Sequence, residues 1–295
     1  MTEGVVYDLG YAPHDGPRLG RSAAIRATIG DGLRRVLGLR RRARKKVFPW
    51  ALLAIPVILA VVFVGQAFFL GEFNPDAESP YGGYPEFFGL VGTIVMIFAA
   101  LAGPELLIPD RVEGVLALYS SRPMRANDYL LARGAALGGV VGFFLLVPLL
   151  LMYVGFAALD ADGFVSAAIG NADDLVQIVL ATAAYVVGYG APALLVAVFA
   201  KRMAPASAAY VGVMIPLNFV ARDVANASSD GVGRFAALLA VFDHPHVVRD
   251  WIFDRAGNDL AVLNAGFDEW VALAVILVVA AVTGFVAVRR YRREM

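Results

Sequence analysis

The sequence predicts an all-α fold, a polytopic membrane helix bundle with six transmembrane helices. The first observation is a set of apolar runs, each close to the roughly 20 residues that a helix needs to cross a bilayer: 49–70, 86–108, 134–158, 175–200, 204–221 and 270–288. The second is composition, since 59% of the residues are hydrophobic and only 17% are charged. Backbone polar groups inside hydrocarbon must be hydrogen-bonded within the protein, so these runs indicate helices and exclude an open sheet.

The third observation is the distribution of charge, which predicts the orientation of the helices. Eleven basic and four acidic residues precede the first span, and the basic ones end in the run 40–46. The connections 71–86 and 159–174 each hold four acidic residues and no basic one. Because positive residues stay on the cytoplasmic side, we expect both termini inside and the connections 71–86, 159–174 and 222–269 outside.

Three parts follow from this topology: a cytoplasmic N-terminal segment 1–48, a six-span transmembrane domain 49–288 and a basic cytoplasmic tail 289–295. No segment between the spans is long enough for a soluble domain of typical size. Any nucleotide-binding or catalytic domain is therefore expected on another chain.

The segment 22–39 is predicted to form an amphipathic helix in the cytoplasmic interface. Ile25, Ile29 and Leu33 recur at helical spacing, while Arg26 and its neighbours fall elsewhere on the helix surface. Such a helix serves either as a lipid anchor or as a docking surface for a partner. The adjoining basic cluster needs no nucleic acid to explain it, because the positive-inside bias already accounts for it.

The connection 110–133 is the most informative cytoplasmic segment. Its apolar patch predicts a short helix, and the break Ser-Ser-Arg-Pro follows at 120–123. Asn127 or Asp128 is then a suitable N-cap for the helix of the third span. Exposed apolar residues on a short helix indicate a protein partner, and the alternative is that the patch packs against its own bundle. The patch consists of Val115, Leu116, Leu118 and Tyr119.

This connection resembles the loop between the second and third spans of ABC-2 type transporter permeases. The resemblance is carried by Glu113-Gly114, Leu116, Leu118, Arg122-Pro123, Arg125, Tyr129 and Arg133. Val115 stands where Thr is usual, and Arg133 stands where Lys is common. The N-terminal residues 7–11 (Tyr-Asp-Leu-Gly-Tyr) and 16–18 (Gly-Pro-Arg) are similar to those of a bacterial subset of the family.

The resemblance implies the membrane subunit of an ATP-driven exporter in the bacterial inner membrane. In that family the loop forms a coupling helix that contacts a separate ATPase subunit. The implied coupling residues are Glu113, Leu116, Leu118, Tyr119, Arg122, Pro123 and Arg125. The family also implies two ATPase subunits per complex and a second permease chain, the same or similar, so that the membrane part is a homodimer or a heterodimer. ATP and Mg²⁺ would then bind the ATPase, and this chain would carry no cofactor.

Spans two and five line the transport path in members of that family. The corresponding residues here are Met96, Phe98, Met214, Asn218 and Phe219. Their mostly apolar character suits a hydrophobic or amphiphilic substrate, although an ordinary bundle core explains it equally well.

The connection 222–269 predicts a re-entrant or interfacial helix outside the membrane. Its apolar run 235–242 is too short to cross, the segment 243–246 (Asp-His-Pro-His) is expected to break the chain, and 247–253 resumes a helical pattern. His244 and His246 raise the question of a metal site. With three histidines and no cysteine in the chain, turn residues are the preferred reading and no metal site is predicted.

Catalytic chemistry has little support in the sequence. Glu105 is the one carboxylate within a predicted span, and we expect it to pair with Arg111 or Arg133. The chain has no phosphate-binding Gly-rich loop and no hydrolase or metalloprotease motif, so we expect no enzyme and no ATP hydrolysis on this chain. Gly134, with Gly138 and Gly142 at the same spacing, predicts close helix packing.

Three other classes of protein share this topology. A secondary transporter is disfavoured because the predicted spans hold no acid or histidine at mid-depth and no obvious inverted repeat. A membrane-embedded enzyme is disfavoured because no catalytic residues cluster. A non-transporting scaffold or signalling subunit stays open, and co-purification of an ATPase together with cargo flux would separate these classes.

Overall fold

The computed structural model describes residues 20–39, 43–73, 82–120, 124–227, 231–255, 257 and 260–294. In these residues the regular structure is helical, without a strand, and six helices are long and apolar enough to cross a membrane. This confirms the all-α polytopic bundle. The six helices are α2 (Ala43–Phe73), α3 (Tyr84–Val112), α5 (Ala126–Leu159), α7 (Ala172–Phe199), α8 (Met203–Ala227) and α12 (Glu269–Glu294).

Most of these helices extend beyond the apolar runs that predicted them. Apolar residues mark only the part of a helix that hydrocarbon surrounds, and polar residues continue it into the interface. Helix α5, for example, begins at Ala126 instead of residue 134. Its N-cap is Arg125, so the predicted caps Asn127 and Asp128 are wrong. Asp128 instead occupies the third helical position, where its carboxylate accepts a hydrogen bond of 2.9 Å from the Arg125 backbone N–H.

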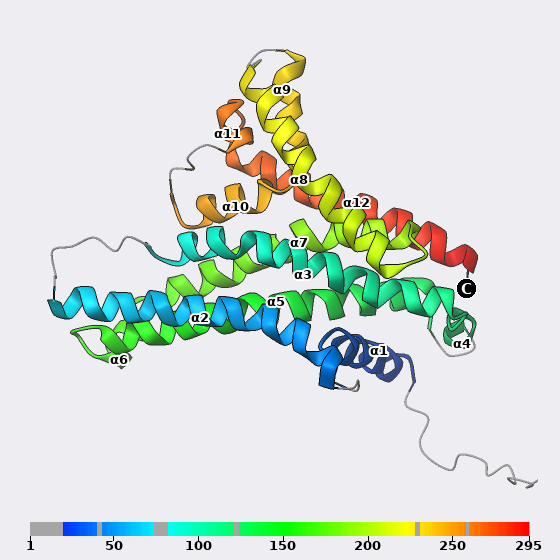
Figure 1. Cartoon of the computed structure of the whole chain (residues 1–295), viewed down its shortest axis with the longest axis horizontal. Coiled ribbons are helices and arrows are strands. Elements are labelled where there is room, and N and C mark those ends of the chain that lie inside the picture. Colours follow the sequence, from blue (N-terminus) through cyan, green and yellow to red (C-terminus); the bar gives the residue numbers. More distant parts are fainter. Residues whose placement is uncertain are drawn as a thin grey trace, which may run out of the picture.

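Helices α2, α3, α5 and α7 run roughly side by side, while α8 and α12 are inclined to them (Figure 1). Helices α1 (Gly20–Val36) and α4 (Leu116–Ser120) lie at the end where α12 terminates, and we call this the α4 end. Helix α6 (Phe164–Gly170) lies at the opposite end. Helix α10 (His244–Ile252) packs beside the first turns of α3 on that opposite side, which we call the α10 end.

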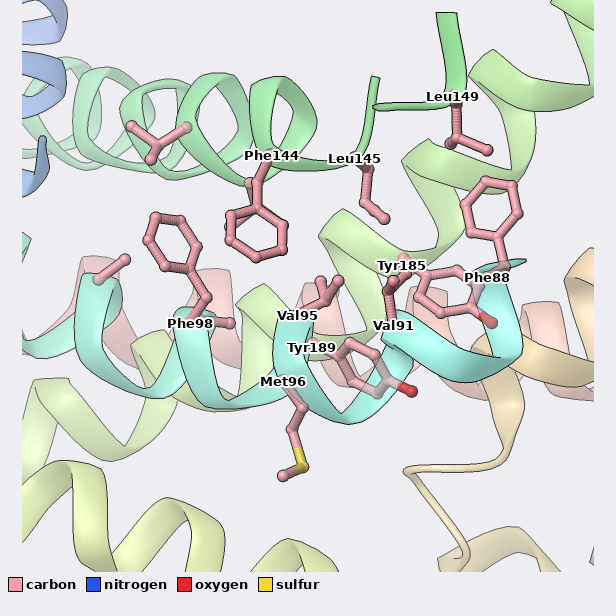
Figure 2. Close-up of a cluster of buried hydrophobic side chains, with 14 of the residues drawn as sticks. Phe88, Val91, Val95, Met96, Phe98, Phe144, Leu145, Leu149, Tyr185 and Tyr189 are labelled. Carbon is pink, nitrogen blue, oxygen red and sulfur yellow. The ribbon is translucent and has the colours of Figure 1, made fainter. Parts of the chain in front are cut away.

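The core of the bundle is formed by α3, α5 and α7 (Figure 2). The ring of Phe98 on α3 stacks on Phe144 of α5 with centroids 4.7 Å apart, and Tyr185 of α7 packs 5.0 Å from Phe88. Helices α2, α8 and α12 are mostly exposed, and their outer faces are as apolar as the core. Outer faces of this kind are expected where lipid, not water, surrounds the protein.

Helix α1 packs on the bundle instead of lying apart from it. At Gly32 an added Cβ would lie 2.7 Å from the Cβ of Ala136 on α5, so the two helices are nearly in backbone contact. Leu33 lies against Gly139, and Val36 is buried in the core cluster. The helix predicted over 22–39 is therefore confirmed as a helix, and it makes extensive protein contacts on α5 and α3.

The connection between α8 and α12 is folded into short helices. They are α9 (Val232–Ala236), a 3-10 turn η1 (Ala237–Leu239), α10 and α11 (Ala261–Asn264). The predicted break at 243–246 is wrong, because α10 starts at His244. Pro245 stands in its first turn, where the missing N–H of proline costs nothing.

Glycines bring α10 close to the bundle, at places other than the predicted ones. An added Cβ at Gly188 of α7 would lie 2.6 Å from Pro245, and one at Gly92 of α3 would lie 2.8 Å from His246. By contrast, Gly134 and Gly142 have open space where a Cβ would stand. At Gly138 an added Cβ would lie 3.5 Å from Val186 of α7, which is an ordinary contact. Within this chain the predicted ladder therefore makes no unusually close helix contact.

Candidate functional site

The short helix α4 is positioned by the turn that ends α3. Gly114 adopts a φ of +70°, a left-handed conformation that suits glycine. The backbone N–H of Val115 then bonds back to the carbonyl of Asp110 at 2.9 Å. This C-terminal turn reverses the chain and lays α4 across the ends of α3 and α5.

Helix α4 has one face on the bundle and one at the surface. Leu116 is 4% exposed, and the ring of Tyr119 lies 5.2 Å from that of Tyr129 on α5. Leu118 is 64% exposed, and Val112 at the end of α3 is 60% exposed. The predicted apolar patch is therefore divided: two of its members pack on their own bundle, and Leu118 stands outward.

The remaining residues predicted for ATPase coupling border α4. Glu113 precedes α4 and Arg125 caps α5, and both are exposed at the α4 end. Arg122 and Pro123 lie outside the described residues, as do the N-terminal motifs at 7–11 and 16–18. The coupling role of this set stays a prediction.

A cluster of paired charges, centred on the buried Arg133 and Asp110, lies beneath α4. We call Asp31, Arg35, Asp110, Tyr129 and Arg133 the charge cluster. The guanidinium of Arg133, which is fully buried, donates to Asp110 at 2.5 Å and to Asp31 at 3.1 Å. The second oxygen of Asp110 accepts from Arg35 at 2.8 Å, and the Tyr129 hydroxyl donates to Asp110 at 2.8 Å.

Opposite charges make this burial possible. Two arginines face two aspartates, and an ion of either sign would be costly here without its partners. Burial lowers the pKa of Arg35, but the Asp110 carboxylate more than offsets this, so the pKa ends above its ordinary value and Arg35 stays a cation. The paired charges join α1, α3 and α5 through charge-assisted hydrogen bonds.

Helix α1 has a second charged attachment near its start. Arg21 forms an ion pair of 2.5 Å with Asp128, the residue that also closes the first turn of α5. Arg21 and Arg35 lie at opposite ends of α1, so the whole helix is held along the bundle.

Contacts of Tyr119 connect α4 with the charge cluster. Its hydroxyl accepts a hydrogen bond from Arg133 at 3.4 Å, and its ring packs on Tyr129. Tyr129 in turn stacks on Tyr291 of α12 with centroids 5.6 Å apart. A displacement of α4 would therefore act directly on groups that hold α1, α3, α5 and α12.

The arginines near this site have other partners than the sequence predicted. Arg133 forms ion pairs with Asp110 and Asp31. The guanidinium of Arg111 donates to the backbone carbonyls of Val198 and Ala200 at the end of α7. Neither therefore serves Glu105 in the way that the sequence suggested. The cluster was missed because Asp110 lies just beyond the predicted span, where a carboxylate looks solvated.

A second buried polar cluster lies at the α10 end, and sequence reasoning missed it. The Nδ1 atom of His246 lies 2.8 Å from the Tyr185 hydroxyl, and its Nε2 atom lies 3.1 Å from that of Tyr189. Arg249 approaches Nδ1 at 3.2 Å and pairs with Asp250 at 2.6 Å. The available signal was the i, i+4 spacing of the two tyrosines, which places both on one face of α7.

The histidines of α10 are buried residues of a helix, not turn residues. Burial first, and then the charge of Arg249, lower the pKa of His246 to about 3, so its imidazole is neutral. His244 bonds to the carbonyl of Leu238 at 3.0 Å. Across the described ranges no three His, Asp or Glu side chains gather as metal ligands.

The residues predicted to line a path are not gathered on one surface. Figure 2 shows Phe98 pointing toward α5, where it meets Phe144, while Met96 points away from α5. Met214 is buried, and the buried Asn218 donates to Asp243 at 3.0 Å. Phe219, by contrast, is 63% exposed on α8. The path-lining role of these residues stays a prediction.

No known family model and no curated protein sequence matches the chain. A functional assignment must therefore depend on the geometry of the α4 end together with the motif residues of the 110–133 connection.

Proposed function

We propose that this chain is the membrane subunit of an ATP-driven transporter of the ABC-2 type, an exporter powered by a separate ATPase that docks on α4. One observation supports the proposal above the others. Helix α4 presents Leu118 outward, while its inner face contacts the charge cluster through Tyr119. A small protruding helix coupled to several long helices is suited to convert movement of a partner into movement of the bundle.

The proposed coupling passes from α4 to the long helices through a chain of side-chain contacts. Closure of the ATPase on ATP would push α4, and Leu116 and Tyr119 would pass the displacement to Tyr129 and Arg133. Because Arg133 and Asp110 are paired, α3 and α5 would move together, and α1 would follow through Arg35. ATP and Mg²⁺ would bind the ATPase and not this chain.

The proposed assembly has two membrane chains, the same or similar, and two ATPases. Closed two-fold symmetry is the commonest arrangement for oligomers. ATP is cytoplasmic, so the proposal places the α4 end and both termini inside, in a bacterial inner membrane. The positive-inside rule supports that orientation, because Arg202 and the basic residues of 289–293 also lie at the α4 end.

The proposed cargo is hydrophobic or amphiphilic. The exposed faces of α2 and α8, including Phe219, are apolar, and the buried polar clusters lie inside the bundle and not on these faces. A path between two chains would therefore offer apolar walls over most of its length. Such walls suit a molecule with an acyl or aromatic part better than an ion or a sugar.

The test is Leu118→Asp, with Leu39→Asp as its matched control. Both side chains are large, apolar and exposed, but Leu39 follows α1 and not α4. If Leu118 docks in an ATPase cleft, an unpaired charge there would cost roughly 3–5 kcal/mol, at least a hundredfold in affinity. We expect Leu118→Asp to insert normally and lose the ATPase, and Leu39→Asp to retain it.

Two results would contradict the proposal in different ways. Retention of the ATPase by Leu118→Asp, with full turnover, would show that α4 is not the coupling element. A wild-type complex that binds the ATPase but shows no stimulation of hydrolysis by amphiphiles, and no flux, would identify the chain as a scaffold.

A further inference from the structure

A basic cleft of about 820 Å³ opens at the α4 end beside α4 itself. Its volume falls within the roughly 300–1,000 Å³ of small-ligand sites. The walls come from the end of α3, the turn between α7 and α8, and the last turns of α12. Its charged lining residues are Arg111, Lys201, Arg202, Arg290 and Glu294.

The cleft has a surplus of positive charge that the protein does not neutralise. Arg111 is occupied by carbonyls at the end of α7, and Arg290 pairs with Glu294 at 3.1 Å. Lys201 and Arg202 are exposed, and within the described part of the chain neither has a carboxylate at ion-pair distance. The positive-inside rule explains the sign of these residues, but not their convergence on one concave surface.

Two hollows that contain exposed phenylalanine side chains adjoin the basic cleft. One of about 570 Å³ shares Lys201 and Arg202 with the cleft and extends to Phe199. Another of about 430 Å³ shares Arg290 and Glu294 with the cleft and is lined by Phe199, Phe285 and Val286 together with Arg289 and Arg293. The two phenylalanines are 59% and 66% exposed.

The depth of these aromatic residues fits a lipid tail. Phe285 precedes Arg290 by five residues on α12, which at the helical rise of 1.5 Å per residue sets it roughly 7.5 Å further along the helix, away from the basic end. The guanidinium of Arg290 lies 5.4 Å from the ring centroid of Phe199, so the charged and apolar parts of the surface are continuous. A ligand that spans both parts must be anionic at one end and apolar at the other.

We propose that this surface binds an anionic phospholipid, with the phosphate between Lys201, Arg202 and Arg290 and the acyl chains along Phe199 and Phe285. Basic pockets between transmembrane helices are suited to such headgroups. An acidic segment of a protein partner would use the charges but not the two membrane-side phenylalanines. The bound lipid would lie against Gly114 and Leu116, and so beside the helix that the proposed ATPase contacts.

The experiment measures thermal unfolding of the full-length chain in a zwitterionic detergent as lipid is added. The probes are phosphatidylglycerol, phosphatidylcholine and inorganic phosphate. We expect phosphatidylglycerol to raise the melting temperature at concentrations where the other two do not. Each basic residue near an anionic lipid surface contributes roughly fivefold to binding, so Lys201→Gln with Arg202→Gln should weaken the apparent affinity about 30-fold.

The matched control is Arg26→Gln with Arg34→Gln. These two residues are exposed on α1 at the same end and do not line the cleft, so the pair removes the same net charge. We expect it to keep the wild-type response to phosphatidylglycerol. Equal weakening by the two double variants, or no weakening by either, would overturn the proposal. A response to inorganic phosphate equal to that of the lipid would also overturn it, since the site would then recognise a soluble anion. None of these results depends on an ATPase, so they are separate from the test of Leu118.

Discussion

The two ends of the bundle are both joined by buried polar side chains, but in different ways. At the α4 end, Arg133 and Asp110 form an ion pair of 2.5 Å in a cluster with two further charges. At the α10 end, the central group is the neutral imidazole of His246 between two tyrosine hydroxyls. Ions need each other in a low-dielectric site, whereas neutral groups lose less when one partner is removed.

This difference suggests different roles for the two ends. At the α4 end, four helices are joined by the charge cluster and by the tyrosines that pack on it. Helix α4 contacts this group through Tyr119, so one contact acts on several helices. At the α10 end a neutral imidazole and two tyrosines form the centre of the cluster, the Arg249–Asp250 ion pair lies beside them within one helix, and α10 packs tightly on Gly92 and Gly188. We therefore expect mutations at the α4 end to alter coupling and stability together, and mutations at the α10 end to alter stability and its dependence on pH.

The largest effect is expected from Asp110→Asn. The change leaves the buried Arg133 guanidinium without its closest anion, and we expect a loss of about 3 kcal/mol in the free energy of unfolding. The matched control is Asp31→Asn, whose carboxylate is 46% exposed and should cost less than about 1 kcal/mol. Chemical unfolding in detergent micelles measures both. Equal losses would show that burial does not set the strength of this cluster.

An intermediate effect is expected from acidification at the α10 end. The folded pKa of His246 is about 3, against about 6.5 in the unfolded chain, so the unfolded state binds a proton first as the pH falls. Protonation of the unfolded chain therefore lowers the free energy of unfolding as the pH falls below about 6.5. At pH 5 the loss from this one histidine is about 2 kcal/mol.

The variant that isolates this contribution is His246→Gln. It should lower stability at pH 7 and reduce the loss between pH 7 and pH 5, when unfolding is measured at both values. Burial also lowers the pKa of His244, which remains in this variant. Part of the pH dependence of stability should therefore remain. An unchanged slope in His246→Gln would mean that His246 does not enter the folded structure as a neutral buried group.

The smallest effect on stability is expected from Tyr119→Phe. The ring contact with Tyr129 is kept, and only the 3.4 Å hydrogen bond from Arg133 is lost, at a cost of at most about 1 kcal/mol. Under the proposed function this variant should still bind the ATPase, unlike Leu118→Asp. Its cargo-stimulated ATP hydrolysis should fall by up to about fivefold. Full stimulation would show that the link between α4 and the charge cluster is not used.

The general plan of this protein could be predicted from the sequence. Hydropathy is summed over neighbours in the chain, and each of the six apolar runs therefore identified its helix. The short helix α4 was also predictable, because an apolar patch between a glycine turn and a proline break has few other conformations. The N-cap of α5 was predicted two or three residues too late, since an aspartate such as Asp128 can act either as the cap or at the third helical position.

The identity of partners was decided by tertiary structure alone. Arg133 meets Asp31, which is 102 residues away, because α1 crosses α5 where Gly32 allows close approach. His246 is buried because α10 folds back onto α7 and α12, where the imidazole also meets Gly92 of α3. The periodicity of a sequence shows which face of a helix is apolar, but not which other helix packs on that face. Side chains from distant segments meet only when helices pack, and packing depends on shape and charge across the whole bundle.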